Sequence, residues 1–476
     1  MSRGKVFSSL IYKFSERLIV KGLGLIISII LARLLSPTEF GQIALIMVFI
    51  NLSIVFIDSG LNTALVQDKH TTNEDYSTVF YISFAVASVI IILLWIFAPF
   101  FCSYYDDVSI ILPLRIYSFS LLISATNSVL VAKMQREMRF KQMMWCNLFA
   151  CIVSGSIGVA MAYAGYGIWA LIAYYFSSSL LQCMSLSVVS KWHPIFTFSI
   201  QRAKTLFSFG WKILVSGLLC SIYYDIRALI IGKLYTPADL GYYNRGQQFP
   251  DVLSHTLDNA IQSVMFPVMA QQQDNKEAVV ATLRKTISMG AFIIMPLMLG
   301  LVAIAEPFIK LLLTDKWLPC VIYLQLICIA NISVPLTSSN LVAIKSLGRS
   351  DIYMKLEIVR RVIMFLILFI SVFCFDSVFA IAVGYLLSLW IEYFVIVIAI
   401  KQLLNIRLKQ QIGVFYKIVL ASILMSVIVY LMGNLSVQPW LLLCIQIPTG
   451  ICIYILLCYI LKIDSFKLLL DKILKK

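Results

Sequence analysis

Charged residues are scarce in this chain. They make up 13% of its 476 residues, whereas a soluble domain carries about 25%. Hydrophobic residues reach 61%, and the mean hydropathy is +0.93. No hydrophilic block is long enough to form a soluble domain. This composition excludes an ordinary water-soluble protein and predicts a membrane protein with many spanning helices.

Motifs for catalysis and metal binding are also missing. The eleven cysteines stand singly, without a CxxC pair, so neither a metal site nor a disulfide framework is expected. The sequence has no glycine-rich phosphate loop and no metal-ligand spacing. We therefore expect no cofactor, no direct use of ATP and no enzyme activity.

The net charge of +15 would fit nucleic-acid binding if the basic residues were clustered. They lie instead in short loops between apolar runs, which is the positive-inside pattern of a membrane protein. If the N-terminus is cytoplasmic, the inside segments hold about 26 Lys and Arg and the outside loops about four. Nucleic acid is thus not an expected partner, and both termini are expected in the cytoplasm. The basic segment 1–13 is expected to lead into a retained first helix.

Fourteen apolar runs are long enough to cross the hydrocarbon core, which needs about 20 residues per helix. The predicted spans are 12–35, 41–66, 77–101, 109–132, 142–163, 166–189, 208–231, 240–268, 286–307, 319–343, 354–374, 377–400, 414–432 and 439–461. The expected fold class is an all-α integral membrane protein with about 14 transmembrane helices.

An internal repeat relates two parts of the chain. Residues 31–41 read LARLLSPTEFG and residues 231–241 read IGKLYTPADLG, an offset of 200. The same offset places Asp58 on Asp258. It carries the first predicted helix onto the seventh, so the repeating unit is six helices of one orientation.

The repeat predicts three parts. They are an N-terminal six-helix lobe (1–200), a second six-helix lobe (201–405), and two additional helices with a basic cytoplasmic tail (406–476). Two equivalent lobes around a central site are the usual arrangement for alternating access.

A polar stripe follows the predicted eighth helix, at spacings that put it on one face. Its members are Asn244, Gln248, Asp251, His255, Asp258 and Gln262. Carboxylates cannot face lipid cheaply, so the stripe should face a water-filled cavity or partner groups inside the bundle. We interpret Asp258 and Asp58 as candidate ion-coupling carboxylates; the alternative is hydrogen bonding between helices. His255 could form a relay with Asp251 and Asp258, or only line the cavity.

Several arginines and lysines lie within predicted helices. Arg227 and Arg245 lie near outer ends, against the positive-inside bias, and a guanidinium suits a diphosphate or an acidic sugar. We therefore add both to the candidate substrate cavity of Asn244, Gln248, Asp251 and His255. The alternative for both arginines is snorkelling to the outer interface.

Other charged residues allow simpler interpretations. Arg17 and Lys21 share one face at the start of the first helix, where they could meet a lipid diphosphate or only anchor the helix. Arg360 and Arg361 are expected to snorkel at an inner helix end, and Arg115 could enter either the cavity or the outer interface.

Three stretches resemble the polysaccharide exporters of the Wzx/WzxC type, in the multidrug/oligosaccharidyl-lipid/polysaccharide superfamily. They are residues 32–67, 235–274 and 346–362, of which the last reads SLGRSDIYMKLEIVRRV. The resemblance implies a flippase that moves an undecaprenyl-diphosphate-linked oligosaccharide across the bacterial inner membrane for O-antigen, capsule or exopolysaccharide synthesis. It also implies antiporter-like coupling to a proton or sodium gradient. Membrane lipids, a polysaccharide polymerase and a chain-length regulator are the further expected partners.

Two other functions stay open. One is a membrane-embedded glycan polymerase or glycosyltransferase, and the sparse outside loops argue against it. The other is a small-molecule exporter of the same superfamily. Arg227 and Arg245 favour an anionic substrate over a cationic drug.

Overall fold

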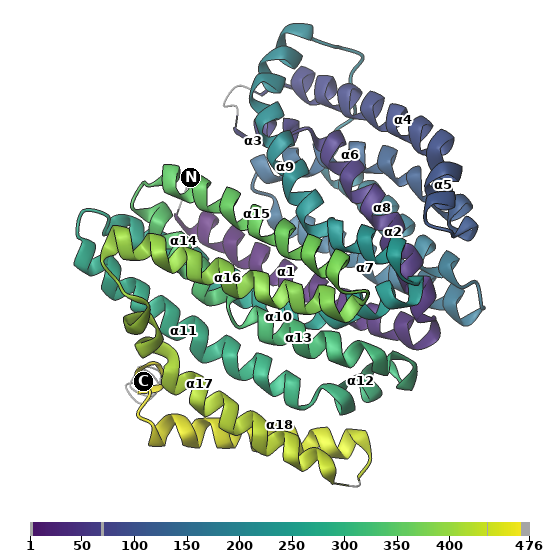
Figure 1. Cartoon of the computed structure of the whole chain (residues 1–476). Coiled ribbons are helices and arrows are strands. Elements are labelled where there is room, and N and C mark those ends of the chain that lie inside the picture. The colour runs from purple at the N-terminus through teal and green to yellow at the C-terminus, as the bar shows by residue number, and fades with distance from the viewer. Residues whose placement is uncertain (1–2, 68–70, 436, 468–476) are drawn as a thin grey trace. The chain divides into compact units, whose positions relative to one another are not determined.

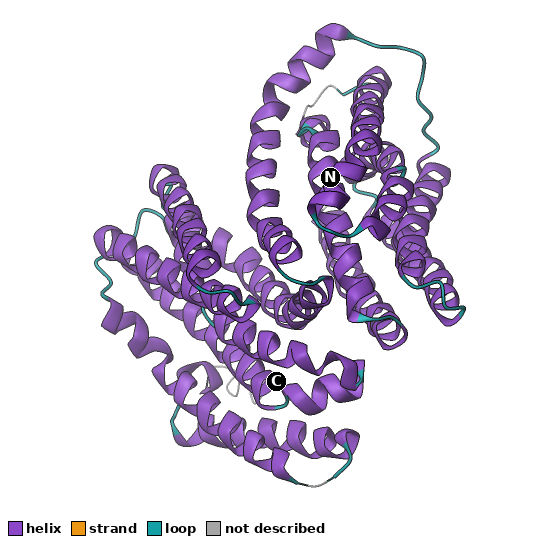
Figure 2. Ribbon diagram, turned by 45° about the vertical axis from the view of Figure 1, so that its right-hand side comes forward, coloured by secondary structure: helices purple, strands orange, loops and turns teal. Residues whose placement is uncertain are grey.

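The computed structural model of the chain is built from helices (Figures 1 and 2). It describes residues 3–67, 71–435 and 437–467. Within these ranges the regular structure is entirely helical, and no strand is formed. The predicted all-α class is confirmed.

The chain separates into two compact units, 1–241 and 242–476. The first unit contains α1 (Arg3–Leu34), α2 (Pro37–Asp58), α3 (Leu61–Gln67), α4 (Asn73–Tyr104), η1 (Val108–Ile110), α5 (Ile111–Ser118), α6 (Ser120–Arg136), α7 (Phe140–Tyr163), α8 (Ile168–Ser190) and α9 (Ile200–Leu234). The long helix α10 (Pro237–Gln271) begins in this unit and continues into the second.

The second unit holds the remaining helices. They are α11 (Lys276–Ala303), α12 (Ala305–Leu313), η2 (Asp315–Cys320), α13 (Val321–Asn331), α14 (Val334–Ser346), α15 (Ser350–Cys374), α16 (Val378–Leu404), α17 (Leu408–Leu431), η3 (Met432–Asn434) and α18 (Pro439–Ile460). The packing groups α9 with the first unit, whereas the boundaries predicted at 200 and 405 follow the repeat and stay a prediction.

Eleven segments of the described chain are long and apolar enough to cross a membrane. Three further helices, α1, α10 and α15, have 32, 35 and 25 residues, which is also sufficient length. Charged and polar side chains lower the hydropathy of α10 and α15. The helices therefore match the fourteen predicted runs.

Four predicted spans are interrupted: the runs 41–66 and 286–307 near their ends, at 59–60 and at Ile304, and two further runs nearer the middle. The run 109–132 is divided at Phe119 between α5 and α6, and the run 319–343 is divided at Ile332 and Ser333 between α13 and α14. Each pair of short helices follows a 3-10 turn, η1 or η2. Hydropathy could not predict the two central breaks, because the mean hydropathy stays high across them, at 1.7 for Val108–Arg136 and 1.8 for Asp315–Ser346. The equivalent interruption in the fourth span of both halves supports the repeat.

The two copies of the repeated motif begin with the same helix cap. Ser36 Oγ accepts a hydrogen bond from the Glu39 amide (3.3 Å), and the Glu39 carboxylate accepts one from the Ser36 amide (2.6 Å). Thr236 and Asp239 make the same pair of bonds at 3.2 Å each. A capping box satisfies two amides that the helix start leaves unpaired, which explains the recurrence of these residue types.

The two motifs also touch each other reciprocally within the first unit. A β-carbon at Gly41 would overlap the backbone carbonyl of Pro237, and a β-carbon at Gly241 would overlap that of Pro37. Glycine at both positions therefore lets the first turns of α2 and α10 cross in close backbone contact.

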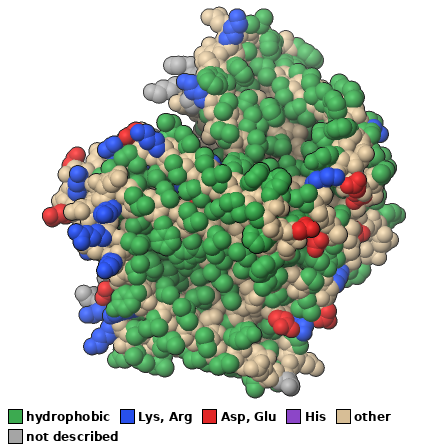
Figure 3. Space-filling view, in the orientation of Figure 1, with side chains coloured by type: hydrophobic (Ala, Val, Ile, Leu, Met, Phe, Trp, Pro, Cys, Tyr) green, Lys and Arg blue, Asp and Glu red, His purple; other side chains and the backbone are tan. Residues whose placement is uncertain are grey.

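Hydrophobic side chains cover most of the face shown in Figure 3, while Lys and Arg gather along its left-hand edge. Many large apolar side chains are exposed: Phe100 is 66% exposed and Phe373 is 73% exposed. An apolar surface of this extent fits lipid rather than water.

Helices α17 and α18 pack on the second unit, mainly against α11 and α12. Ser426 Oγ donates to the Leu299 carbonyl (2.8 Å), and the Tyr454 hydroxyl donates to the Phe292 carbonyl (2.9 Å). Gln446 Nε2 ties the pair together by donating to the Val429 carbonyl (2.9 Å). The position of these two helices could not be predicted from the repeat, because they lie outside it.

Candidate functional site

Asp58 is the last residue of α2, where the chain turns before α3. Ser59 and Gly60 take left-handed conformations there, with φ of 43° and 67°. Asn62 Nδ2 then donates to Asp58 Oδ1 at 2.8 Å. The turn thus places a carboxylate and an amide side by side.

A cavity of about 390 Å³ opens over this carboxylate in the first unit. Its polar lining comes from α2, α3 and α6: Asp58, Asn62, Thr63, Ser124, Asn127, Ser128 and Gln135. A polar cavity among apolar helices is where a membrane transporter holds ions or substrate groups. The cavity is the first part of the candidate site.

A row of amides extends from the cavity across α6, α8 and α7. Asn127 Nδ2 donates to Gln182 Oε1 (2.8 Å), and Gln182 Nε2 donates to Asn147 Oδ1 (2.7 Å). Among the described residues, Asn62 Oδ1 and Asn127 Oδ1 are buried without a hydrogen-bond partner. A buried acceptor without a donor costs about 1–3 kcal/mol, so these oxygens are suited to meet a donor or a cation.

Asp258 has an equivalent environment in the second unit, on α10. Ser338 Oγ of α14 donates to Asp258 Oδ1 at 2.6 Å, and Gln262 Nε2 donates to the same oxygen at 3.1 Å. Gln262 Nε2 also lies 3.0 Å from Ser338 Oγ. In both units a carboxylate therefore accepts from an amide four residues later, and hydroxyl-bearing residues of the interrupted span face it.

Asp251 and His255 lie along the same face of α10. Asp251 accepts from Gln247 and from Asn331 of α13, both at 2.9 Å. His255 Nε2 lies 3.9 Å from Asp251 Oδ1, with the side chain 46% exposed. The stripe is thus partly bonded to neighbouring helices and partly open, as expected for polar groups inside a bundle.

Arg227 and Arg245 are both buried, with 4% and 5% of their surface exposed. The Arg227 guanidinium lies 5.9 Å from the ring centre of Tyr223. Arg245 donates to Gln248 and lies 5.6 Å from the ring of Trp317. Snorkelling side chains keep the charged group in water, so this burial favours an internal role. Asn244 and Gln248, on the same helix as Arg245, are half-buried.

The residues proposed to receive the lipid diphosphate lie near the start of the chain. The Arg17 side chain falls outside the described residues, and Lys21 is exposed. Arg115 donates to the Trp95 carbonyl (2.9 Å) and lies 5.4 Å from that ring, so its contacts are made with α4.

The expected snorkelling is wrong for Arg360, whereas for Arg361 it stays a prediction. Arg360 Nε lies 2.9 Å from Glu392 Oε2 on α16, and Glu392 is completely buried. Glu357 bridges the two arginines, at 2.6 Å from Arg360 and 3.5 Å from Arg361. A buried glutamate must be paired or neutral, so it holds Arg360 inside the bundle.

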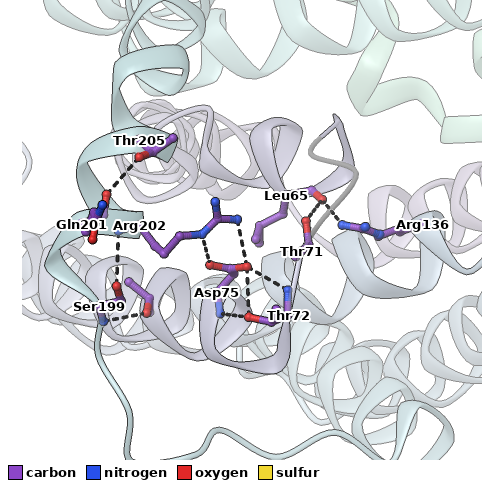
Figure 4. A network of polar contacts seen from close by, with 10 residues as sticks. Leu65, Thr71, Thr72, Asp75, Arg136, Ser199, Gln201, Arg202 and Thr205 are labelled. Carbon is purple, nitrogen blue, oxygen red and sulfur yellow. Dashed lines mark hydrogen bonds and ion pairs between the residues drawn. The ribbon is translucent and has the colours of Figure 1, made fainter.

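Figure 4 shows a second ion pair that the sequence did not reveal. Asp75 of α4, 1% exposed, accepts from Arg202 Nε (2.5 Å) and Nη2 (3.0 Å) of α9. Asp75 also caps its own helix by accepting from the Thr72 amide at 2.8 Å. In the sequence Arg202 is one more basic residue of a predicted inside loop. The ion pair holds the start of α9 against the start of α4 within the first unit.

Among the described residues there is no group of three or more His, Cys, Asp or Glu placed to hold a metal ion. The site consists instead of single carboxylates with amide and hydroxyl partners, and of arginines beside aromatic rings. Such a set can exchange protons or bind anionic groups, and these properties belong to a transporter. The fold is that of an all-helical membrane protein with many spans, and the site is of a kind that membrane transporters use.

The family follows from comparison with known sequences. Residues 30–322 match the family model described as "Polysaccharide biosynthesis protein", and the chain belongs to that family.

The relatives agree with this assignment. The chain is 26% identical over 333 residues to the succinoglycan biosynthesis transport protein ExoT of Rhizobium meliloti, covering 70% of this chain and 67% of ExoT. It is 25% identical to the teichuronic acid biosynthesis protein TuaB of Bacillus subtilis (63% and 62% covered). It is 21% identical to the lipopolysaccharide biosynthesis protein WzxC of Escherichia coli (69% and 68% covered).

Solved structures share the fold. The lipid II flippase MurJ, in an inward closed conformation, matches with a TM-score of 0.78 at 14% identity, covering 96% of this chain and 99% of MurJ. An inward-facing multidrug resistance transporter of the MATE family matches with a TM-score of 0.60 at 14% identity (83% and 98% covered). At this identity the likeness concerns the fold alone.

Proposed function

We propose that the protein is a flippase that moves an undecaprenyl-diphosphate-linked oligosaccharide across the bacterial inner membrane for surface polysaccharide synthesis. The observation that carries the proposal is membership of the polysaccharide biosynthesis family with a relative named as a transport protein. The fold shared with a lipid II flippase over nearly the whole chain supports the same conclusion. The protein then transports its substrate and leaves its bonds unchanged.

The buried arginines support an anionic substrate group. Arg227 and Arg245 keep their charge at any physiological pH, and each lies among polar or aromatic groups inside the protein. A diphosphate or an acidic sugar would match a guanidinium in charge and geometry. Asn244, Gln248, Asp251 and His255 would add hydrogen bonds to sugar hydroxyls.

The repeated carboxylates support coupling to a proton or sodium gradient. Asp58 and Asp258 each have amide and hydroxyl neighbours, and each lies near a buried amide oxygen without a partner. Binding and release of one cation at such a site would change the charge that the lobe must bury, and so would favour one access state over the other. Alternating access then follows from the two-lobed fold.

The proposal also includes the membrane in which the protein lies, the bacterial inner membrane, and the orientation of the chain across it. An even number of spans puts both termini on one side, and the positive-inside bias makes this the cytoplasm. The substrate would enter there, near Arg17 and Lys21, and leave at the periplasmic side. A polymerase and a chain-length regulator would act on it next.

The test uses a strain that lacks this gene while upstream glycan synthesis is intact. Surface polysaccharide is quantified together with the lipid-linked repeat unit, whose leaflet is determined by accessibility to an impermeant reagent. We expect complete single units to accumulate in the inner leaflet and the surface glycan to disappear.

Two other results would replace the proposal. Complete units already in the outer leaflet would mean that polymerisation or ligation is missing, in favour of a glycan polymerase or glycosyltransferase. Unchanged glycan would favour a small-molecule exporter, which the shared MATE fold also accommodates.

A further inference from the structure

Two helices at matching places in the repeat contain a proline in their interior. They are α4 with Pro99 and α11 with Pro296, each the third long helix of its half. The two prolines are 197 residues apart, close to the offset of 200 between the repeated motifs. A proline has no amide hydrogen, so the carbonyl four residues earlier loses its partner within the helix. These freed carbonyls belong to Trp95 and Phe292.

Both freed carbonyls accept a hydrogen bond from a side chain of another helix. Arg115 Nη2 of α5 donates to the Trp95 carbonyl at 2.9 Å. The Tyr454 hydroxyl of α18 donates to the Phe292 carbonyl, also at 2.9 Å. In each unit a side chain therefore replaces the amide that proline removes.

The replacement is particular to α4 and α11. Three other prolines lie inside α-helices of the described chain: Pro250 and Pro267 of α10, and Pro448 of α18. Among the described residues, no side chain donates to the carbonyl that precedes any of these three by four positions. A proline inside a helix is thus not enough to bring a donor, and the two matching helices are the ones that have it.

The surroundings of α4 explain why its freed carbonyl needs a donor. Trp95 is 39% exposed, and only 28% of the most apolar part of α4 is buried within the protein. Lipid cannot satisfy a free carbonyl, so the donor must come from the protein. Helix α5 follows α4 through the short turn η1 and supplies Arg115, whose guanidinium also lies 5.4 Å from the centre of the Trp95 ring.

The second unit uses a donor from outside the repeat. Tyr454 belongs to α18, one of the two additional helices, and is 8% exposed. A buried tyrosine hydroxyl needs a hydrogen-bond partner, and the freed carbonyl provides one. The Tyr454 and Phe292 rings also lie together, with their centres 5.6 Å apart. Helix α18 therefore supplies to α11 what Arg115 supplies to α4.

We propose that α4 and α11 are a matched pair of proline hinges, and that Arg115 and Tyr454 are the positioning residues that hold them. A helix bends most easily at a proline, where one hydrogen bond of the backbone is missing. The side chain that takes up the freed carbonyl then fixes the bend and keeps the backbone satisfied. Bending of these helices during alternating access rests on the proposed function, whereas the two hydrogen bonds do not.

The first test restores the missing amide. Tyr454→Phe removes only the hydroxyl, and Pro296→Ala gives α11 an amide that can bond the Phe292 carbonyl. Arg115→Met and Pro99→Ala make the same comparison in α4. Thermal unfolding of the purified full-length protein in detergent is measured for each single and double variant, as two double-mutant cycles.

We expect Tyr454→Phe and Arg115→Met each to lower the unfolding midpoint by about 2 °C or more while the proline is present. After Pro296→Ala or Pro99→Ala the same substitutions should cost less, because the helix then supplies the donor itself. Equal losses with and without the proline, in either unit, would overturn the proposal. Should Arg115→Met fail to fold, recovery by Pro99→Ala has the same meaning, and no recovery counts against the proposal.

Ser426→Ala is the matched control for the tyrosine. The Ser426 hydroxyl donates to the Leu299 carbonyl of the same helix α11 at 2.8 Å, but Ala303, four residues later, keeps its amide. Its loss should therefore cost less than loss of the Tyr454 hydroxyl, and Pro296→Ala should not change that cost. An equal gain from Pro296→Ala in both backgrounds would mean that alanine stabilises α11 in general, which would overturn the proposal.

The second test measures export of the glycan by the two alanine variants in cells. Pro99→Ala and Pro296→Ala should partly lose export without a fall in the unfolding midpoint, because a helix with all its backbone bonds bends less readily. Normal export by both variants would overturn the hinge role. The unfolding cycles need no transport, so their result stands whether or not the chain proves to be a flippase.

Discussion

Gly41 presents its α-carbon to the backbone carbonyl of Pro237, so closely that no side chain fits between them. The residue 200 positions later, Gly241, has the same relation to Pro37. The two copies of the motif therefore hold each other at one crossing of α2 and α10. This crossing requires that neither Gly41 nor Gly241 carries a β-carbon.

Gly41→Ala should lower the stability of the protein. A methyl group there forces the two backbones apart, and overpacking of this kind costs about 1–3 kcal/mol. Gly24→Ala is the matched control, because nothing lies within 4 Å of a β-carbon at position 24 of α1. Alanine is the better helix former, so the control should unfold at an equal or higher temperature. Thermal unfolding in detergent measures both; similar curves for the two variants would contradict the packing argument.

Asp258→Asn should sharply reduce export, by about tenfold or more, because the variant cannot take up and release a cation at that position. Asparagine keeps the shape and can still accept the bond from Ser338, so folding should be retained. Asp58→Asn should give a smaller loss, since Asp58 accepts one hydrogen bond, from Asn62, whereas Asp258 accepts two. Export is measured in cells with and without a dissipated gradient.

The control for the carboxylates is Asp274→Asn, an exposed position in the turn after α10. It should export normally. A fully active Asp258→Asn variant that still responds to the gradient would remove Asp258 from the coupling mechanism.

Arg227→Gln and Arg245→Gln should lower export of an anionic glycan more than export of a neutral one. Loss of a buried charge that meets an anion costs about 2 kcal/mol or more of binding. Arg245→Lys keeps the charge and separates that effect from misfolding. Export of two glycan types by one strain background measures the difference. Equal losses for both glycans would mean that the arginines do not recognise charge.

Arg202→Ala should destabilise the protein strongly, because it leaves the Asp75 carboxylate buried without its partner. Breaking such a pair costs about 3 kcal/mol or more. Arg349→Ala is the matched control: Arg349 bonds Asp351 with similar geometry (2.9 and 2.8 Å), but both residues are exposed. Exposed pairs contribute about 0–1 kcal/mol, so the control should change the unfolding temperature little. Equal effects would show that burial of Asp75 is unimportant.

Sequence patterns predicted the helices well because hydropathy reports burial in lipid or protein alike. The repeat predicted that Asp58 and Asp258 are equivalent, and the structure gives both the same amide partner four residues later. The pattern could not predict Asn127 and Gln182, since single polar residues in an apolar run have no spacing signal. These two were recognised only from the cavity and the hydrogen bonds that they share.

Charge pairs were the least predictable feature. Arg360 and Glu392 are 32 residues apart in sequence, and Asp75 and Arg202 are 127 apart. A rule based on loop charge assigns each arginine to the membrane surface, because it considers one residue at a time. The ion pairs depend on distances between helices, which only the fold supplies.

Helices α17 and α18 give the two halves of the repeat different surroundings. They cover α11, the third long helix of the second copy, and the most apolar part of α11 is 50% buried. Only 28% of the corresponding part of its counterpart α4 is buried, so most of that surface is available to lipid. Two helices at matching places in the repeat therefore have different surroundings, mainly protein for α11 and mainly lipid for α4. On α4 one apolar residue can replace another with little effect, whereas on α11 each replacement must also fit a protein neighbour. Among related sequences, apolar residues should therefore vary more on α4 than on α11.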